Sequence, residues 1–146
     1  MSQNNQTDEE TDTRDEHLGD ATLVSNSEVI VEDEYFQESK LSRDTMYSQT
    51  LETYQEMLNN TNVSEEQKAI VTQEITQLNR EKNAIMICEN LISTKGFEDC
   101  VIFVNLDSIS VIIKTDKLKQ DEIAQIQNII SREMNAKIEN IHIMTK

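Results

Sequence analysis

The stretch Phe97–Lys114, FEDCVIFVNLDSISVIIK, decides the fold because it holds two short apolar runs separated by a turn. Cys100–Val104 is apolar at every position, which suits a strand that is flanked on both sides, so we predict the central strand here. Ser108–Thr115 reads as a second strand with Val111 and Ile113 on one side. Asn105–Asp107 between the runs favours a tight hairpin.

Two helices are predicted before this hairpin. Tyr47, Leu51, Tyr54 and Leu58 recur at helical spacing, which indicates a helix over residues 33–60. Ser64–Gln67 then spells a capping box, so a second helix should begin at Glu65. Its apolar row contains Val71, Ile75, Leu78, Ile85 and Ile92. Gly96 follows this row, where a helix end favours a residue that tolerates positive φ.

A third helix and a last strand are predicted after the hairpin. Thr115 or Asp116 can cap the helix, and Ile138, Ile141 and Ile143 mark a strand within 137–145. The helical row is Ile123, Ile126, Ile130 and Met134. The fold class is therefore α+β, with the order helix-strand-strand-helix-strand, a three-stranded sheet covered by two helices, and an extra N-terminal helix. Strands two and three should be parallel with a right-handed crossover, and a central first strand gives the order 2-1-3.

Acidic residues divide the chain. It has 146 residues with 28 Asp and Glu against 13 Lys and Arg, a net charge of -15. Residues 1–39 hold 12 acids and one base (net -11), which leaves -4 for the remainder. Few aliphatic residues accompany this charge near the start. We therefore expect a disordered acidic spacer over 1–32, the N-terminal helix over 33–62 and the α+β domain over 63–146.

The composition excludes several classes of function. The two glycines, Gly19 and Gly96, are too far apart for a phosphate-cradling loop. The negative charge disfavours nucleic acid, which proteins hold mainly through Lys and Arg. No window approaches the length of about 20 apolar residues that crosses a bilayer, and the polar, acidic start does not resemble a signal peptide. The chain as written is expected to be soluble.

Candidate chemical groups are few. Cys88 and Cys100 form no zinc-type cluster with His17 or His142, and we interpret them as buried hydrophobes, with a disulfide in an oxidising compartment as the alternative. His142 alternates with isoleucines and should face away from the core. The strand-end acids Asp99, Asp107 and Asp116 suit turns and caps better than catalysis or calcium binding. We predict no catalytic, metal or cofactor site.

Several segments resemble the stage III sporulation protein AH family, whose soluble domain has the ring-building-motif fold. They are Lys95–Asp99 with the strand after it, Val111–Lys114, Gln120–Gln127, Ile130–Glu133, Asp33–Phe36 and Lys40–Asp44. The resemblance covers about residues 33–144. It implies a noncatalytic protein of the mother-cell membrane around the engulfed forespore, with its soluble domain between the two membranes. There it binds the stage II sporulation protein Q, which has a LytM-like domain, in an engulfment zipper or channel ring.

The same resemblance implies self-association into a ring. Members carry an N-terminal transmembrane anchor, and none is found in this chain, so we interpret the acidic segment as a spacer beside a removed anchor. A cytosolic RNA-binding domain of KH-like topology is the alternative function, although the G-x-x-G loop of that class is missing. A small hydrolase acting through His142 or Cys88 is a third.

Partner-binding residues are predicted on a strand edge and on the first helix. An exposed edge at Ser108, Ser110, Ile112 and Lys114 would offer unpaired amides to another chain's strand. Tyr35, Phe36 and Tyr47 would supply aromatic contacts if their helix is not fully buried. The competing interpretation is that these aromatic side chains fill the domain's own core.

Overall fold

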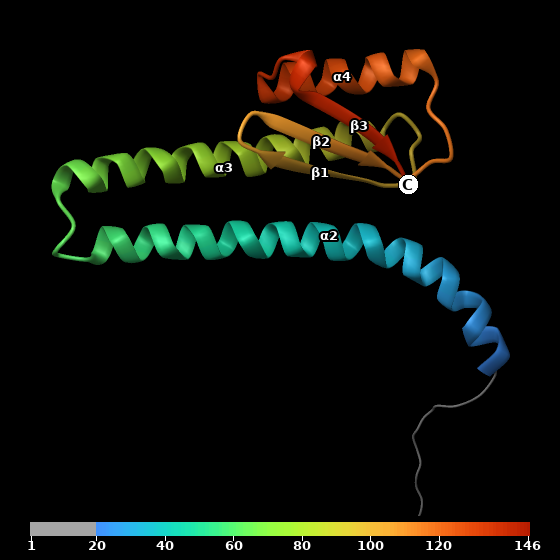
Figure 1. Ribbon diagram of the computed structural model, residues 1–146, viewed down its shortest axis with the longest axis horizontal. Helices are drawn as coiled ribbons and strands as arrows, with labels where there is room; N and C mark the ends of the chain where they lie inside the picture. The colour runs from blue at the N-terminus through green and yellow to red at the C-terminus, as the bar shows by residue number, and fades with distance from the viewer. Residues whose placement is uncertain (1–19) are drawn as a thin grey trace, which may run out of the picture. The chain divides into compact units, whose positions relative to one another are not determined.

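The computed structural model describes the backbone of residues 20–146 and the side chains of residues 34–146 (Figure 1). The chain divides into two units, residues 1–35 and 36–146. Helix α2 (Asp20–Asn59) contributes to both, and it begins earlier than the predicted start at residue 33. Of the spacer predicted over residues 1–32, residues 1–19 lie outside the described residues, and residues 20–32 belong to α2. The second unit contains the sheet and the helices that pack against it.

Helix α3 (Glu65–Ser93) begins and ends where the sequence indicated. The Ser64 hydroxyl accepts a hydrogen bond from the amide of Gln67 at 3.2 Å, which confirms the predicted cap. Thr94 caps the C-terminus, and Gly96 follows with a φ of 98°. Glycine at this position lets the chain leave the helix and enter the first strand without a steric penalty.

The sheet has the order β1-β2-β3, which corrects the predicted order 2-1-3. Strand β1 (Cys100–Asn105) and strand β2 (Ser108–Ile113) form the predicted antiparallel hairpin. Strand β3 (Ile141–Thr145) pairs with β2 in parallel, also as predicted. The central strand is therefore β2, and β1, which is apolar from Cys100 to Val104, lies at an edge.

Helix α4 (Gln120–Met134) connects β2 to β3, followed by the short 3-10 helix η1 (Ile138–Asn140). The predicted cap at Thr115 or Asp116 is wrong, because the N-cap is Lys119. The Lys119 amide donates a hydrogen bond to Glu122 Oε1 at 2.9 Å. A side chain of the first helical turn therefore accepts from the backbone amide of the N-cap residue. Asn135 ends the helix with a φ of 51°.

Helices α3 and α4 cover one face of the sheet, and Figure 1 shows α3 running behind the strands. Alternate residues of β1 and β2, such as Ile102 and Val111, point into this layer and meet Ile92 of α3 and Ile126 of α4. All four are fully buried. Each such side chain contributes roughly 1.5–3 kcal/mol by leaving water. Tyr47 of α2 joins the same cluster, so the second half of α2 belongs to the domain.

Candidate interaction surface

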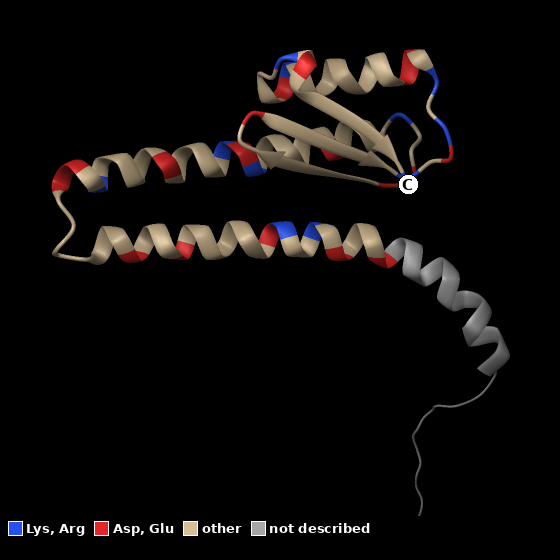
Figure 2. Ribbon diagram, viewed as in Figure 1, with Lys and Arg blue, Asp and Glu red and all other residues tan. Residues whose placement is uncertain are grey.

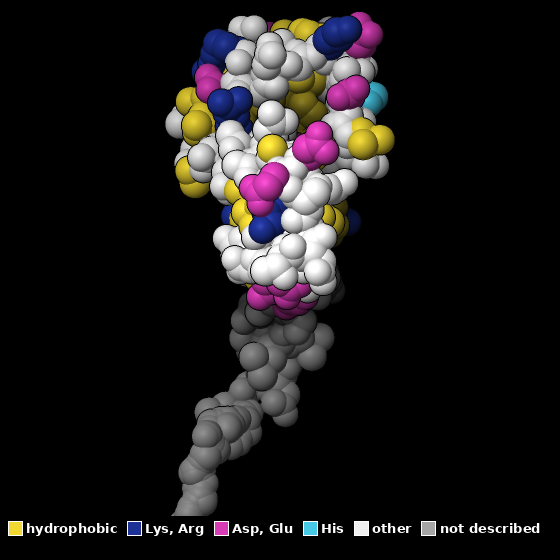
Figure 3. All heavy atoms as spheres, turned by 90° about the vertical axis from the view of Figure 1, so that its left-hand side faces the viewer, with side chains coloured by type: hydrophobic (Ala, Val, Ile, Leu, Met, Phe, Trp, Pro, Cys, Tyr) yellow, Lys and Arg dark blue, Asp and Glu magenta, His cyan; other side chains and the backbone are white. Residues whose placement is uncertain are grey.

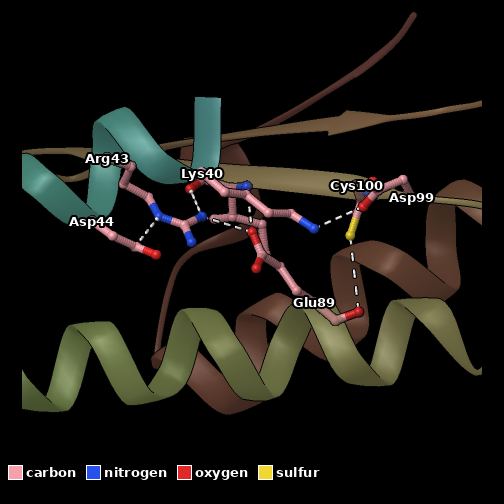
Figure 4. A network of polar contacts seen from close by, with 7 residues as sticks. Lys40, Arg43, Asp44, Glu89, Asp99 and Cys100 are labelled. Carbon is pink, nitrogen blue, oxygen red and sulfur yellow. Dashed lines mark hydrogen bonds and ion pairs between the residues drawn. The ribbon is translucent and has the colours of Figure 1, made fainter. Parts of the chain in front are cut away.

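An ion pair from two helices occupies the outer edge of β1 at Ile102 (Figure 4). Arg43 of α2 places Nη1 2.7 Å from Oε2 of Glu89 on α3, and the same nitrogen donates to the Ile102 carbonyl at 2.9 Å. Glu89 Oε2 in turn accepts from the Ile102 amide at 3.0 Å. The pair therefore bonds both backbone groups of Ile102, as a neighbouring strand would.

Two further contacts hold α2 in place beside this pair. Lys40 Nζ lies 2.7 Å from Asp99 Oδ1, which also accepts from the amide of Cys100. The Tyr47 hydroxyl donates to Glu81 at 2.5 Å. Burial and the bond to Glu81 both raise the pKa of Tyr47, because each disfavours the phenolate. Lys40, Arg43 and Tyr47 thus fasten one helix face to β1 and α3.

Arg43 remains a cation although its side chain is only 7% exposed. Burial works against its charge, but hydrogen bonds and ion pairs with Glu89 and Asp44 outweigh burial, so the pKa of Arg43 is raised. The guanidinium needs these acceptors, since an unpaired buried charge is costly. The network is structural in character, because it connects α2 and α3 to the edge of β1.

The opposite edge of the sheet, formed by β3, is open. Strand β3 pairs with β2 only, and no other strand of residues 20–146 lies beyond it. His142 and Met144 point to the face away from the two helices and are exposed. An edge of this kind offers main-chain donors and acceptors to another chain.

A hollow of about 580 Å³ lies where the β1–β2 turn approaches α3 and the end of α4, at the end of the domain that faces the viewer in Figure 3. Val104, Ile109 and Met134 line it together with charged side chains, among them Arg80 and Glu133. Leu106, in the turn, is 92% exposed and has a φ of 58°. The lining mixes both charge signs and does not define a ligand.

The predicted partner-binding strand is not at an edge. Ser108, Ser110, Ile112 and Lys114 belong to β2 or follow it directly, and β2 pairs on both sides. Their backbone amides are thus engaged within the sheet, and only Ser108 is exposed. The physical basis of that prediction is wrong, because the edge position belongs to β1 and β3.

The predicted aromatic contacts lie mostly inside the domain. Phe36 is 1% and Tyr47 5% exposed, so both fill the core as the competing interpretation held. Tyr35 is half-buried and belongs to the first unit of the chain. The structure does not gather these residues with the β2 residues into one exposed surface.

The described side chains offer little for catalysis. Cys88 and Cys100 are free thiols, and burial raises the pKa of each to about 12, which keeps them protonated and unreactive. Residues 34–146 contain no group of three or more His, Cys, Asp and Glu side chains that could hold a metal. Acidic residues outnumber basic ones along the described parts of α2, α3 and α4, and the basic residues are dispersed among them (Figure 2).

Arg43 and Glu89 were not predicted as a pair. A signal existed, because Phe36, Lys40, Arg43 and Tyr47 continue the apolar row of the first helix at spacings of four, three and four. Charged residues in such a row indicate buried or half-buried partners. The identity of the partner was not readable, since Glu89 lies 46 positions away.

These features define a small α+β domain with one sheet edge, at β3, that is open to contacts with another chain. The chain belongs to the SpoIIIAH-like protein family, which matches residues 1–143. No curated protein sequence matches it. Within the described part of the chain, no helix is both long and apolar enough to cross a membrane.

Two solved structures are similar to the chain. A chain of the structure described as the SpoIIQ–SpoIIIAH pore-forming complex has a TM-score of 0.69 and 18% identity, covering 77% of this chain and 96% of that one. This likeness shows the shared fold. The type III secretion protein EscJ of enteropathogenic E. coli matches 50% of each chain at 22% identity, with a TM-score of 0.43 that is too low to establish a common fold.

Proposed function

We propose that this protein is a noncatalytic sporulation protein. Its domain would bind the stage II sporulation protein Q (SpoIIQ) between the two membranes around the forespore. Membership of the SpoIIIAH-like family carries the proposal, and the fold shared with a chain of the SpoIIQ–SpoIIIAH pore-forming complex supports it. The bound pair would contribute to an engulfment zipper or channel ring. A membrane anchor outside the described part of the chain would hold the domain in place.

The surface of the domain is consistent with a binding role. It has an open strand edge at β3 and scattered exposed apolar side chains, including Leu106, Ile138 and Met144. The strand edge can accept a strand from another chain, whereas single exposed apolar side chains are common on folded domains and are not by themselves evidence of a contact. The buried cysteines and the mixed charges of the helices suggest no competing chemistry.

The direct test mixes the full chain with the soluble domain of SpoIIQ at micromolar concentrations and measures the mass by size-exclusion chromatography with light scattering. A single peak with the summed mass of the two proteins is expected. Separate elution of both proteins would contradict the proposal. The chain alone serves as control, and a mass above that of one copy would reveal the self-association that a ring requires.

A gel shift with single-stranded RNA at several salt concentrations tests the alternative function. The family assignment favours the sporulation function, so we expect no shift. Salt-dependent binding would instead support an RNA-binding domain, because neutralised phosphates make such binding sensitive to salt.

A further inference from the structure

We propose that an extended segment of the partner adds a strand to the open edge of β3, where it bonds the backbone of Ile143 and Thr145. This inference rests on the proposed function, because it takes the SpoIIQ domain as the partner. It replaces the site predicted on β2, which is a central strand.

The hydrogen-bond pattern identifies the backbone groups that face outward. The Lys146 amide donates to the Ile113 carbonyl at 2.9 Å, and the parallel register pairs Ile113 with Thr145. Alternate residues of a strand direct their backbone groups to the same neighbour. His142, Met144 and Lys146 therefore bond to β2.

The intervening residues Ile141, Ile143 and Thr145 turn their backbone groups away from β2. The Ile141 amide is already used, because it donates to the Ile138 carbonyl at the end of η1. Two amides, of Ile143 and Thr145, and three carbonyls remain on the outer side. Such an alternating row of donors and acceptors is complementary to a β-strand.

The two edges of the sheet differ in how they are protected. At β1, Arg43 and Glu89 occupy both backbone groups of Ile102. Ile141–Thr145, in contrast, contains no charged residue and no proline, which are the usual devices that keep an edge strand from pairing. Strand β3 therefore leaves more of its outward backbone groups to a partner than β1 does.

The occupant is a different protein rather than a second copy of this chain. Residues 40–146, which contain the sheet, carry a net charge of -4, so two copies would repel one another weakly rather than attract. A two-fold pairing of five-residue strands would also supply little of the roughly 1,200–2,000 Å² that stable interfaces bury. Added area must come from partner side chains, and Ile138 and Met144, which are 50% and 45% exposed, lie beside the edge to receive them. We therefore infer a partner segment with apolar residues at alternate positions.

Proline at residue 145 tests the strand addition. Thr145→Pro removes one outward amide, whereas Thr145→Ala keeps it, and the exposed side chain packs little in either case. Calorimetric titration of the full-length chain with the SpoIIQ soluble domain should show wild-type affinity for Thr145→Ala. Affinity about tenfold weaker is expected for Thr145→Pro, because one intermolecular hydrogen bond is lost.

The outcomes separate the two proposals. Equal affinity of Thr145→Pro and Thr145→Ala would overturn the strand addition while leaving SpoIIQ binding intact. Failure of the wild-type chain to bind would overturn both. If circular dichroism shows that Thr145→Pro does not fold, Thr145→Lys replaces it with Thr145→Gln as control, since a lysine on an edge strand disfavours pairing. Weaker binding of the lysine variant alone supports the inference, and equal binding of both variants contradicts it.

Discussion

Arg43 and Glu89 lie 2.7 Å apart and together bond the amide and the carbonyl of Ile102 in β1. Two side chains from separate helices thereby take the place of a neighbouring strand. The arrangement explains how a strand that is apolar from Cys100 to Val104 can lie at the edge of a sheet, because both backbone groups of Ile102 at its middle are already bonded. It also makes α2 a necessary part of the domain.

Removing the cation of this pair should destabilise the domain strongly. Arg43→Met leaves the Ile102 carbonyl without its side-chain donor, and leaves the carboxylate of Glu89, which is 13% exposed, without its cation. We expect a loss of about 2–4 kcal/mol in the free energy of unfolding, measured in urea. Arg132→Met is the matched control, because Arg132 is 59% exposed in its pair with Glu133 and such pairs contribute about 0–1 kcal/mol. Equal losses in both variants would contradict the role of Arg43.

The Tyr47 hydroxyl should contribute a smaller amount. Tyr47→Phe keeps the buried ring but removes the 2.5 Å hydrogen bond to Glu81. The free energy of unfolding should fall by about 1–2 kcal/mol, as for other hydrogen bonds to a charged acceptor. Tyr54→Phe, at a half-buried position further along the same helix face, is the control and should change little. An unchanged free energy of unfolding in Tyr47→Phe would show that the hydrogen bond to Glu81 does not help to hold α2 in place.

The cysteines should make stability fall at alkaline pH. Burial raises the pKa of Cys88 and Cys100 to about 12 in the folded state, from the ordinary value of 9.0. The unfolded chain therefore loses these protons first, so their contribution is fully present below pH 9 and declines between pH 9 and about 12. Urea unfolding at stepped pH should show this slope, and the Cys88→Ala, Cys100→Ala double variant should show a shallower one. If the double variant has the same dependence of unfolding free energy on pH as the wild type, the raised pKa values of the two cysteines are contradicted.

Leu106 should be better replaced by glycine than by alanine. Its φ of 58° strains any residue with a side chain, and at 92% exposure the leucine gains almost nothing by packing. Leu106→Gly should exceed Leu106→Ala in the free energy of unfolding by about 1 kcal/mol. The converse change, Gly96→Ala at a φ of 98°, should destabilise by a similar amount, although open space surrounds its Cα. A more stable alanine variant at residue 106 would contradict this.

Much of the fold could be predicted from local patterns. The cap at Ser64, the stop at Gly96 and the Asn105–Asp107 turn each depend on a few neighbouring residues, and the structure has all three. Strand order could not be obtained in this way. A hairpin followed by a helical crossover is compatible with either order, and the apolar run at Cys100–Val104 favoured the wrong one.

The candidate site was harder to predict than the fold. Burial of β1 comes in part from Arg43 and Glu89, which reach its edge from distant parts of the sequence. The helical row of α2 indicates that Arg43 faces the core, but no sequence pattern identifies Glu89 or the edge of β1 as its partner. Once the order β1-β2-β3 is known, Ile143 and Thr145 are seen to lie on an edge strand. Ser108 to Lys114, where the edge was predicted, instead belong to the central strand or directly follow it.

Amide hydrogen exchange of the full chain, followed by NMR with and without the SpoIIQ soluble domain, tests the central claim most directly. The protein should bind, and the amides of Ile143 and Thr145 should exchange more slowly in the complex. The Ile102 amide should not change, because it already bonds Glu89. Unaltered exchange throughout the chain at saturating SpoIIQ would contradict the binding function, and protection confined to other elements would contradict the site on β3.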